Sequence, residues 1–235
     1  MNPIFLKAEW RKLLMVNYEV DPVILQPFIP AHTKLDLHEG KCLVSIVGFM
    51  FLNTKIKGIK IPFHVNFEEV NLRFYITHQT PEGELKRGTS FIKEIVPKPA
   101  ITFVANSLYK EKYTTLPMSH EWKEDNNQLQ VKYSWGQSNF MSCLAENQLK
   151  ELKTNSLEEF ITEHYWGYTQ LSATQTSEYG VEHPRWQTYP IKQFEVKIDF
   201  ESVYGKAFAH LKSQKPHSVL LAEGSEITVR KGQSL

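Results

Sequence analysis

The sequence predicts a mainly β fold with short helices, built as a single-domain coiled antiparallel β-barrel or cone. About a dozen short segments alternate apolar and polar residues, and turn residues separate them. The chain has 235 residues, of which 41% are hydrophobic, which suffices for one large core. Because no internal repeat, linker or low-complexity segment interrupts it, we expect residues 1–235 to form one domain.

The first elements are expected to be a strand, a short helix and a hairpin. Residues 14–20 alternate as in a strand, and Asp21 followed by Pro22 provides an N-cap and a first-turn proline. Residues 35–37 and the apolar run 42–52 then flank a glycine-containing turn, which predicts a hairpin. The run is too short to span a bilayer, which needs about 20 residues. It suits a strand buried on both faces.

The segment FEEVNLRFYI, residues 67–76, has two sharply different faces, because successive side chains of a strand point to opposite sides. One face carries Val70, Leu72, Phe74 and Ile76, and the other carries Glu69, Asn71, Arg73 and Tyr75. The apolar face predicts core. The polar face fits either solvent or the lining of a pocket. A glycine turn connects this strand to a second strand over 89–96, so the two form a hairpin.

A lysine, Lys98, stands between two prolines where that second strand ends and a helix begins. The remaining elements are expected in this order: a helix from Pro99, strands over 129–135 and 140–144, a short helix capped by Ser156, strands over 165–168 and 194–200, and a hairpin at Gly224 joining 218–221 to 227–230.

Charge and motifs exclude several classes of function. The net charge is +1 and the basic residues are scattered, so neither nucleic acid nor a membrane is expected as a partner. No phosphate loop, dinucleotide fingerprint or GxSxG motif occurs, and the histidines lack HxH or HExxH spacing. We therefore expect no cofactor and no metal. Cys42 and Cys143 suit buried reduced thiols, and the first ten residues lack a secretory signal, which favours a cytoplasmic protein.

Three stretches resemble one bacterial family, the YqjF-like proteins, a conserved group of unknown function within the acetoacetate decarboxylase-like superfamily. The stretches are YEVDPVILQPFIP with LDLHEG, EEVNLRFYI with GTSFIKEIVPKP, and LEEFITEHYWGY with GVEHPRW. The similarity extends from Trp10 to about Gly232. It implies a cone-like antiparallel barrel enclosing a small-molecule cavity, in agreement with the strand pattern.

The resemblance also implies site residues. In the decarboxylase a lysine of a Pro-Lys-Lys stretch forms a Schiff base with a 3-oxo acid, and Lys98 is the matching position here. Arg11 matches an arginine that precedes the first strand. The second lysine is replaced by Pro99, and the acidic residues of the neighbouring strands find no match. A Schiff-base amine must be neutral near pH 7, and Pro99 supplies no charge that would favour this. Lys98 is therefore a nucleophile, a cationic anchor for a carboxylate, or an exposed loop residue.

The other candidates each have a structural alternative. Arg73 suits carboxylate recognition, with Asn71 beside it, or a plain ion pair with Glu69. His183 and Glu69 are candidate proton donors or acceptors, and His183 alternatively has only a structural role. The aromatic rings of Tyr165 and Trp186 suit the wall of a pocket or the core.

We expect a small-molecule organic acid, an oxo or carboxylic acid, to bind between the strand of Arg73 and the strand that leads to Lys98. One hypothesis is a lyase of the acetoacetate decarboxylase type. The alternative is a non-catalytic binding or sensing protein, and a third, weaker hypothesis is a purely structural partner protein. Exposed strand edges favour pairing with a second copy of the chain, so the formation of a homo-oligomer is kept as an alternative.

Overall fold

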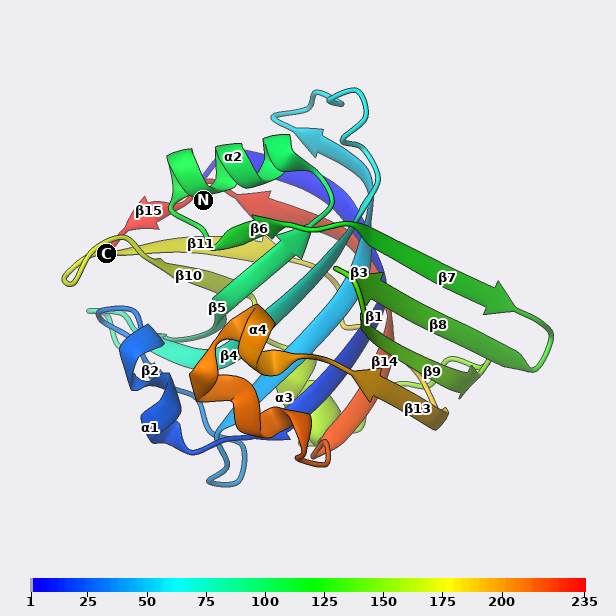
Figure 1. The fold of residues 1–235 in the computed structure, drawn as a ribbon. Coiled ribbons are helices and arrows are strands. Elements are labelled where there is room, and N and C mark those ends of the chain that lie inside the picture. The colour runs from blue at the N-terminus through cyan, green and yellow to red at the C-terminus, as the bar shows by residue number, and fades with distance from the viewer. Residues whose placement is uncertain (1) are drawn as a thin grey trace.

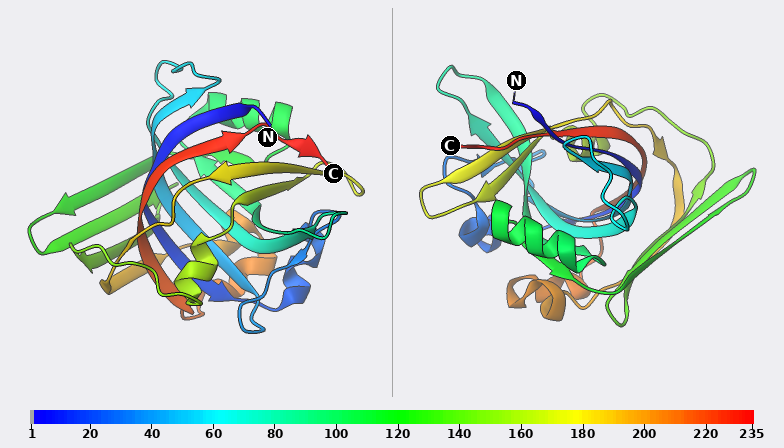
Figure 2. Two further views of the ribbon diagram at one scale, coloured as in Figure 1. Left: turned by 180° about the vertical axis from the view of Figure 1, so that it is seen from behind. Right: turned by 90° about the horizontal axis from the view of Figure 1, so that it is seen from above.

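The computed structural model describes residues 2–235, and its main feature is an 11-stranded sheet coiled into a cone-like barrel (Figure 1). The ring runs β14-β1-β3-β4-β5-β10-β11 and is closed by pairing of β11 with β14, as the end-on view of Figure 2 shows. The predicted fold class is confirmed, with two parallel pairings, β5 with β6 and β5 with β10. The strands of this sheet are β1 (Ile4–Glu19), β2 (Lys34–Leu35), β3 (Leu43–Ile56), β4 (Phe67–Gln79), β5 (Leu85–Val96), β6 (Tyr113–Thr115), β10 (Trp166–Gln170), β11 (Thr176–Glu182), β12 (Thr188–Tyr189), β14 (Ser218–Arg230) and β15 (Gln233–Ser234).

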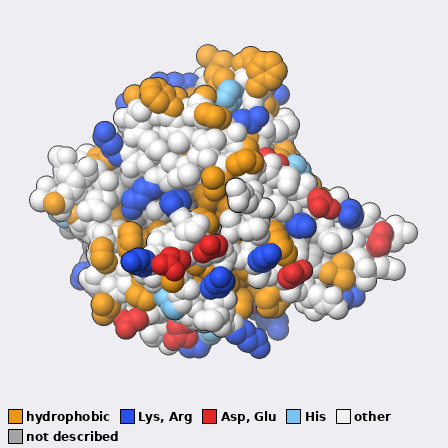
Figure 3. All heavy atoms as spheres, in the orientation of Figure 1, with side chains coloured by type: hydrophobic (Ala, Val, Ile, Leu, Met, Phe, Trp, Pro, Cys, Tyr) orange, Lys and Arg blue, Asp and Glu red, His pale blue; other side chains and the backbone are white. Residues whose placement is uncertain are grey.

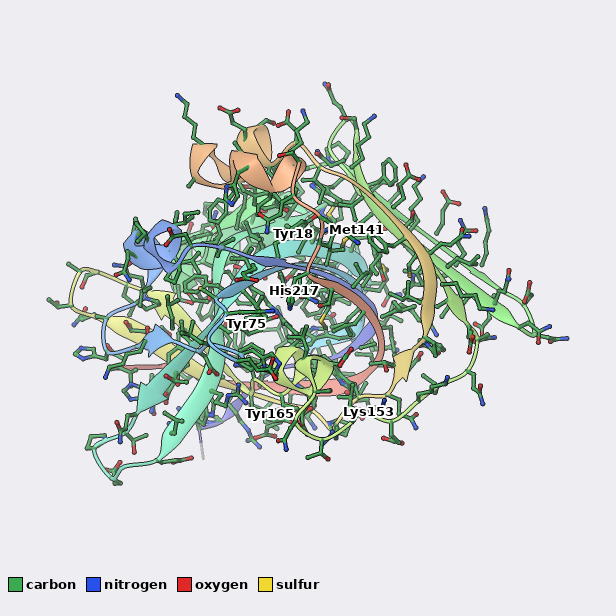
Figure 4. The ribbon with its side chains drawn as sticks, turned by 90° about the horizontal axis from the view of Figure 1, so that it is seen from below. Tyr18, Tyr75, Met141, Lys153, Tyr165 and His217 are labelled. Carbon is green, nitrogen blue, oxygen red and sulfur yellow. The ribbon has the colours of Figure 1, made fainter. Side chains whose placement is uncertain are left out.

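Both faces of the barrel wall are buried, and alternation along the strands assigns side chains to each. In β4 the apolar side chains Val70, Leu72, Phe74 and Ile76 belong to an outer core, whereas Tyr75 belongs to a separate inner core. Figure 4 shows Tyr75 inside the ring of strands, and Tyr18 and Met141 outside it. The expected burial of β3 on both faces is confirmed from Leu43 to Phe51.

A second, four-stranded sheet, which the sequence analysis did not separate from the barrel, covers the outer core (Figure 1). The contact is close at Gly48 of β3, where an added Cβ would lie 2.3 Å from Cε of Met141 and 3.0 Å from Cδ2 of Tyr133. The absence of a side chain at Gly48 therefore lets the sheet approach the barrel. Its strands are β7 (Met118–Glu124), β8 (Gln128–Trp135), β9 (Asn139–Glu146) and β13 (Ile191–Lys197).

Short helices fill the ends and sides of the barrel, and their predicted starts are confirmed. Asp21 accepts a hydrogen bond from the amide of Val23 at the start of α1, and Ser156 accepts one from the amide of Glu159 at the start of α3. Pro99 is the first residue of α2. The helices are α1 (Pro22–Leu25), η1 (Gln26–Phe28), α2 (Pro99–Tyr109), α3 (Leu157–Thr162), α4 (Phe200–Tyr204) and η2 (Lys206–Lys212). No helix of the described residues is long and apolar enough to cross a membrane.

Two predicted hairpins are wrong. Gly224 does not end a strand but lies within the continuous strand β14, at φ 82° and with its Cα so close to β1 that a Cβ would lie 2.0 Å from the Trp10 carbonyl oxygen. Here the glycine permits close approach of two strands and makes no turn. The strand β2 pairs with β4 and not with β3. The apolar run forms β3, whose two neighbours in the sheet are β1 and β4.

Candidate functional site

The barrel interior contains a cavity of about 460 Å³, the size of a small-molecule site. Its wall combines aromatic and aliphatic side chains with a limited set of polar ones. The polar and charged side chains at the wall are those of His64, Glu69, Asn71, Arg73, Thr89, Glu94, Tyr109, Glu111, Tyr113, Thr162, His164, Ser177, Tyr179, His183 and Arg230.

The polar face of β4 lies along this wall at Glu69, Asn71 and Arg73. The Asn71 amide donates to Oε1 of Glu69 at 2.9 Å, and the Tyr113 hydroxyl donates to Oε2 at 3.1 Å. Both Glu69 oxygens are thus held by neutral donors. No ion pair joins Arg73 to Glu69 within residues 2–235. The plain ion pair with Glu69, which was the structural alternative for Arg73, is therefore not formed among the described residues.

Arg73 keeps part of its hydrogen-bonding capacity free. One terminal nitrogen donates to the Ile161 carbonyl oxygen at 3.1 Å, at the end of α3, and contacts the Met15 sulfur at 3.8 Å. Nε of Arg73 is buried and has no partner. The indole nitrogen of Trp10, also at the wall, is buried and unpartnered too. Unpaired buried donors cost stability, so the wall at Arg73 suits an acceptor supplied by a ligand.

Three carboxyl groups gather at another part of the wall. Glu94 of β5 is the cross-strand partner of Asn71 in β4 and of Tyr113 in β6. Glu111 follows α2 and accepts from the Thr169 hydroxyl at 2.7 Å. Burial raises the pKa of Glu69 and of Glu111 to about 7, and burial with repulsion from the other two raises the pKa of Glu94 well above its usual range. The cluster therefore holds protons near neutral pH.

A histidine held by a carboxylate completes the wall. Nε2 of His164 donates to Oδ2 of Asp36 at 3.0 Å, and Nε of Arg87 donates to the same oxygen at 2.7 Å. Nδ1 of His164 is then the unprotonated nitrogen, and it is buried without a partner. Burial lowers the pKa of His164 to about 4 despite Asp36, so the imidazole is neutral at pH 7.

The expected aromatic residues form a stack beside the cavity. The His183 ring stacks on Trp186 with centroids 4.1 Å apart, and the centroid of the Tyr165 ring lies 4.7 Å from that of His183. His183 and Trp186 are at the cavity wall, whereas Tyr165 only supports them. Burial lowers the pKa of His183 to about 4, and the Arg73 charge acts in the same direction.

The structure does not bring Lys98 or Arg11 to the cavity. Lys98 is the N-cap residue of α2, and its side chain makes no capping hydrogen bond. Arg11 lies on the other face of β1, paired with Glu9 at 2.7 Å and Glu223 at 3.7 Å. No lysine of the described residues lines the cavity. The expected pairing of Lys98 with Arg73 at one anion is therefore not formed.

Reduction with borohydride in the presence of acetoacetate should give no adduct at Lys98, because a Schiff base at this position would form outside the cavity. Peptide mapping by mass spectrometry, with Lys98→Arg as the control, checks this. An acetoacetate adduct that maps to Lys98 and disappears in the Arg variant would contradict the structural placement.

One rim of the cavity carries exposed apolar side chains (Figure 3). The helix α2 contributes Ile101 and Val104 to the wall, and its outward face leaves Phe103 72% exposed. The β3–β4 loop contributes Ile61, and beside it Phe63 is 89% exposed. No residue of α2 is fully buried, so this part of the wall has little packing support.

Sequence reasoning missed Glu94, Glu111 and His164. Alternation in β5 favours Lys93 as the neighbour of the polar β4 face, but a bulge in β5, between Phe91 and Lys93, shifts the register and turns Glu94 inward. Glu111 and His164 lie in connections, where no periodicity marks them. Within residues 2–235 no group of three or more His, Cys, Asp or Glu side chains is placed to hold a metal ion.

Comparison with known families gives a match over residues 7–226 to the family DUF2071, described as an uncharacterized conserved protein. The chain belongs to this family. A curated relative, YqjF of Bacillus subtilis strain 168, is 30% identical over 79 residues, a stretch that covers 33% of this chain and 33% of YqjF. The match thus spans about a third of that relative.

Solved structures show the same fold at low sequence identity. Acetoacetate decarboxylase of Legionella pneumophila is 12% identical with a TM-score of 0.64, over 99% of this chain and 88% of its own. An acetoacetate decarboxylase-like enzyme of Sphingomonas wittichii RW1 is also 12% identical, with a TM-score of 0.66 over 98% and 93%. The enduracididine biosynthesis enzyme MppR, solved in complex with pyruvate, has 11% identity and a TM-score of 0.64 over 100% and 91%. These likenesses establish the acetoacetate decarboxylase-like fold.

Proposed function

We propose that this protein binds a small oxo or carboxylic acid in the barrel cavity, with the carboxylate on the guanidinium of Arg73. The observation that carries the proposal is the buried, unpartnered Nε of Arg73 at the cavity wall. A guanidinium with free donors in a fixed orientation suits a carboxylate. That MppR, a protein of similar fold, is described in complex with pyruvate supports an acid of this size.

Glu69 is the candidate for moving a proton in the bound state. Its pKa, raised by burial to about 7, lies where a general acid or base works best at neutral pH. The hydrogen bonds from Asn71 and Tyr113 fix the carboxyl group in one position. His183, neutral at pH 7 and also at the wall, is the second proton acceptor.

Non-catalytic binding or sensing is the second candidate function. It is favoured by the composition of the cavity wall. Among the described residues the wall has no lysine that could form a Schiff base with the ligand and so provide the electron sink for decarboxylation. The two candidates share the binding step and differ in turnover. Carbon dioxide release from acetoacetate, measured against the Glu69→Gln variant, separates them.

Arg73→Gln should weaken the binding of pyruvate and acetoacetate by about 10- to 100-fold, since a charge-assisted hydrogen bond is worth roughly 1.5–3 kcal/mol. Trp10, Trp166 and Trp186 line the cavity, so their fluorescence reports occupancy. Lys123→Gln, which removes an exposed positive charge from the second sheet, is the control and should bind as wild type does. Equal affinities of wild type and Arg73→Gln would refute the proposal.

A further inference from the structure

Within the described residues, the carboxyl cluster of Glu69, Glu94 and Glu111 is not paired with a cationic side chain. Within residues 2–235 none of the three forms an ion pair, and the hydrogen-bond donors that reach them come from Asn71, Tyr113, Thr169 and the backbone of Lys112. Among the lysines of the described residues, Lys112 acts on Glu94 and Glu111, and its ammonium lies over the Phe28 ring at 5.6 Å. Arg73 acts on Glu69 but bonds to a carbonyl oxygen and a sulfur. The cavity thus has an excess of acidic groups.

Two unpartnered acceptors point to what the cluster binds. Glu94 is 3% exposed and Asn71 is 2% exposed, and Oε2 of Glu94 and Oδ1 of Asn71 are buried at the cavity wall with no hydrogen-bond partner. The Asn71 amide nitrogen donates to Glu69, which leaves the oxygen as the free atom. The unpaired atom of Arg73 is a donor, whereas those of Asn71 and Glu94 are acceptors. The cavity is therefore polarised.

We propose that the ligand carries a protonated nitrogen, an ammonium or guanidinium, that binds to Glu94, Glu111 and Oδ1 of Asn71. This inference rests on the proposed function, because the carboxylate of the same ligand is on Arg73. Asn71 and Arg73 are successive inward positions of β4, about 7 Å apart along the strand. An ω-amino acid of about five carbons spans that separation. The rings of Tyr113 and Tyr179 at the same wall add faces on which a cation is favoured.

A purely anionic ligand would use the same cluster differently, with protonated carboxyl groups as donors, and proton linkage separates the two cases. The empty cluster holds protons up to about pH 7 and beyond. A cation replaces those protons, so its binding releases protons and strengthens as the pH rises from 6 to 8. An anion requires the protonated groups, so its binding weakens over the same range.

The test is titration calorimetry of the full chain with 5-aminopentanoate, pentanoate and pentylamine, in two buffers of different ionisation enthalpy at pH 6, 7 and 8. We expect 5-aminopentanoate to bind at least tenfold more tightly than pentanoate, with proton release and tighter binding at higher pH. Glu94→Gln should weaken 5-aminopentanoate at least tenfold and change pentanoate less than twofold. Glu195→Gln, an exposed acid of β13, is the matched control and should leave both unchanged.

Other outcomes separate this inference from the proposed function. Equal affinity for 5-aminopentanoate and pentanoate, or proton uptake on binding, would overturn the protonated nitrogen and leave the carboxylate on Arg73 standing. A third outcome is that pentylamine binding depends on Glu94 while Arg73→Gln leaves the binding of 5-aminopentanoate unchanged. That result would support the nitrogen site and overturn the carboxylate site. Absence of binding by all three compounds would count against both.

Discussion

Glu111→Gln should raise the free energy of unfolding at pH 8 by on the order of 3 kcal/mol, which corresponds to roughly 6–12 °C in Tm. Burial raises the pKa of Glu111 to about 7, above its value in the unfolded chain. The folded state therefore binds more protons, so wild-type stability falls as the pH rises from about 4.5 to 7 and stays low above 7. Glutamine keeps the oxygen that accepts from Thr169 and carries no charge.

The pH dependence distinguishes this cause from a general packing effect. At pH 5 wild-type Glu111 is protonated, so wild type and variant should melt within a few degrees of each other. Thermal unfolding followed by circular dichroism from pH 5 to 8 measures the difference. A variant that is equally stabilised at pH 5 and pH 8, or destabilised at pH 8, would show that the negative charge of Glu111 does not destabilise the folded state.

Asp36→Asn should have the opposite effect and lower the free energy of unfolding at pH 7 by on the order of 2 kcal/mol. Burial alone would raise the pKa of Asp36, but hydrogen bonds from His164 and Arg87 outweigh it and hold that pKa below its ordinary value. Asparagine offers a neutral oxygen to two donors and leaves the Arg87 charge unbalanced. The Arg87 side chain is 37% exposed, so water limits the loss.

The sign of the pH dependence is reversed for this variant. The contribution of a carboxyl group with a lowered pKa is present above its unfolded pKa near 3.8 and is lost as the pH falls further. The difference in the free energy of unfolding between wild type and Asp36→Asn should therefore persist from pH 5 to 8 and become small towards pH 3. Denaturant unfolding at these pH values measures it, and a gap that widens on acidification would contradict the role given to Asp36.

The sequence was sufficient to predict the strand with two faces, since alternation alone places Glu69, Asn71 and Arg73 on one side of β4. It also predicted where α1, α2 and α3 start, because capping residues and prolines act locally. The cone-like barrel followed from the strand pattern together with the family resemblance. These features depend on neighbours within a few residues.

Features set by contacts distant in sequence could not be predicted. The bulge between β4 and β5 places Glu94 in the cavity and turns Lys93 outward, where its ammonium donates to the Val203 carbonyl oxygen. Alternation without the bulge gives the reverse assignment, a lysine inside and an acid outside. Gly224 similarly looks like a turn residue until β1 is placed against it. Each error comes from one residue whose conformation a neighbouring strand decides.

Soaking pyruvate into crystals of the protein tests the central claim most directly, since it locates the anion relative to Arg73. We predict the pyruvate carboxylate within hydrogen-bonding distance of the Arg73 guanidinium, with Nε among the donors, and no such occupancy in crystals of Arg73→Gln. Pyruvate bound at Lys98 or Arg11 with the cavity empty, or bound equally in the Arg73 variant, would contradict the account.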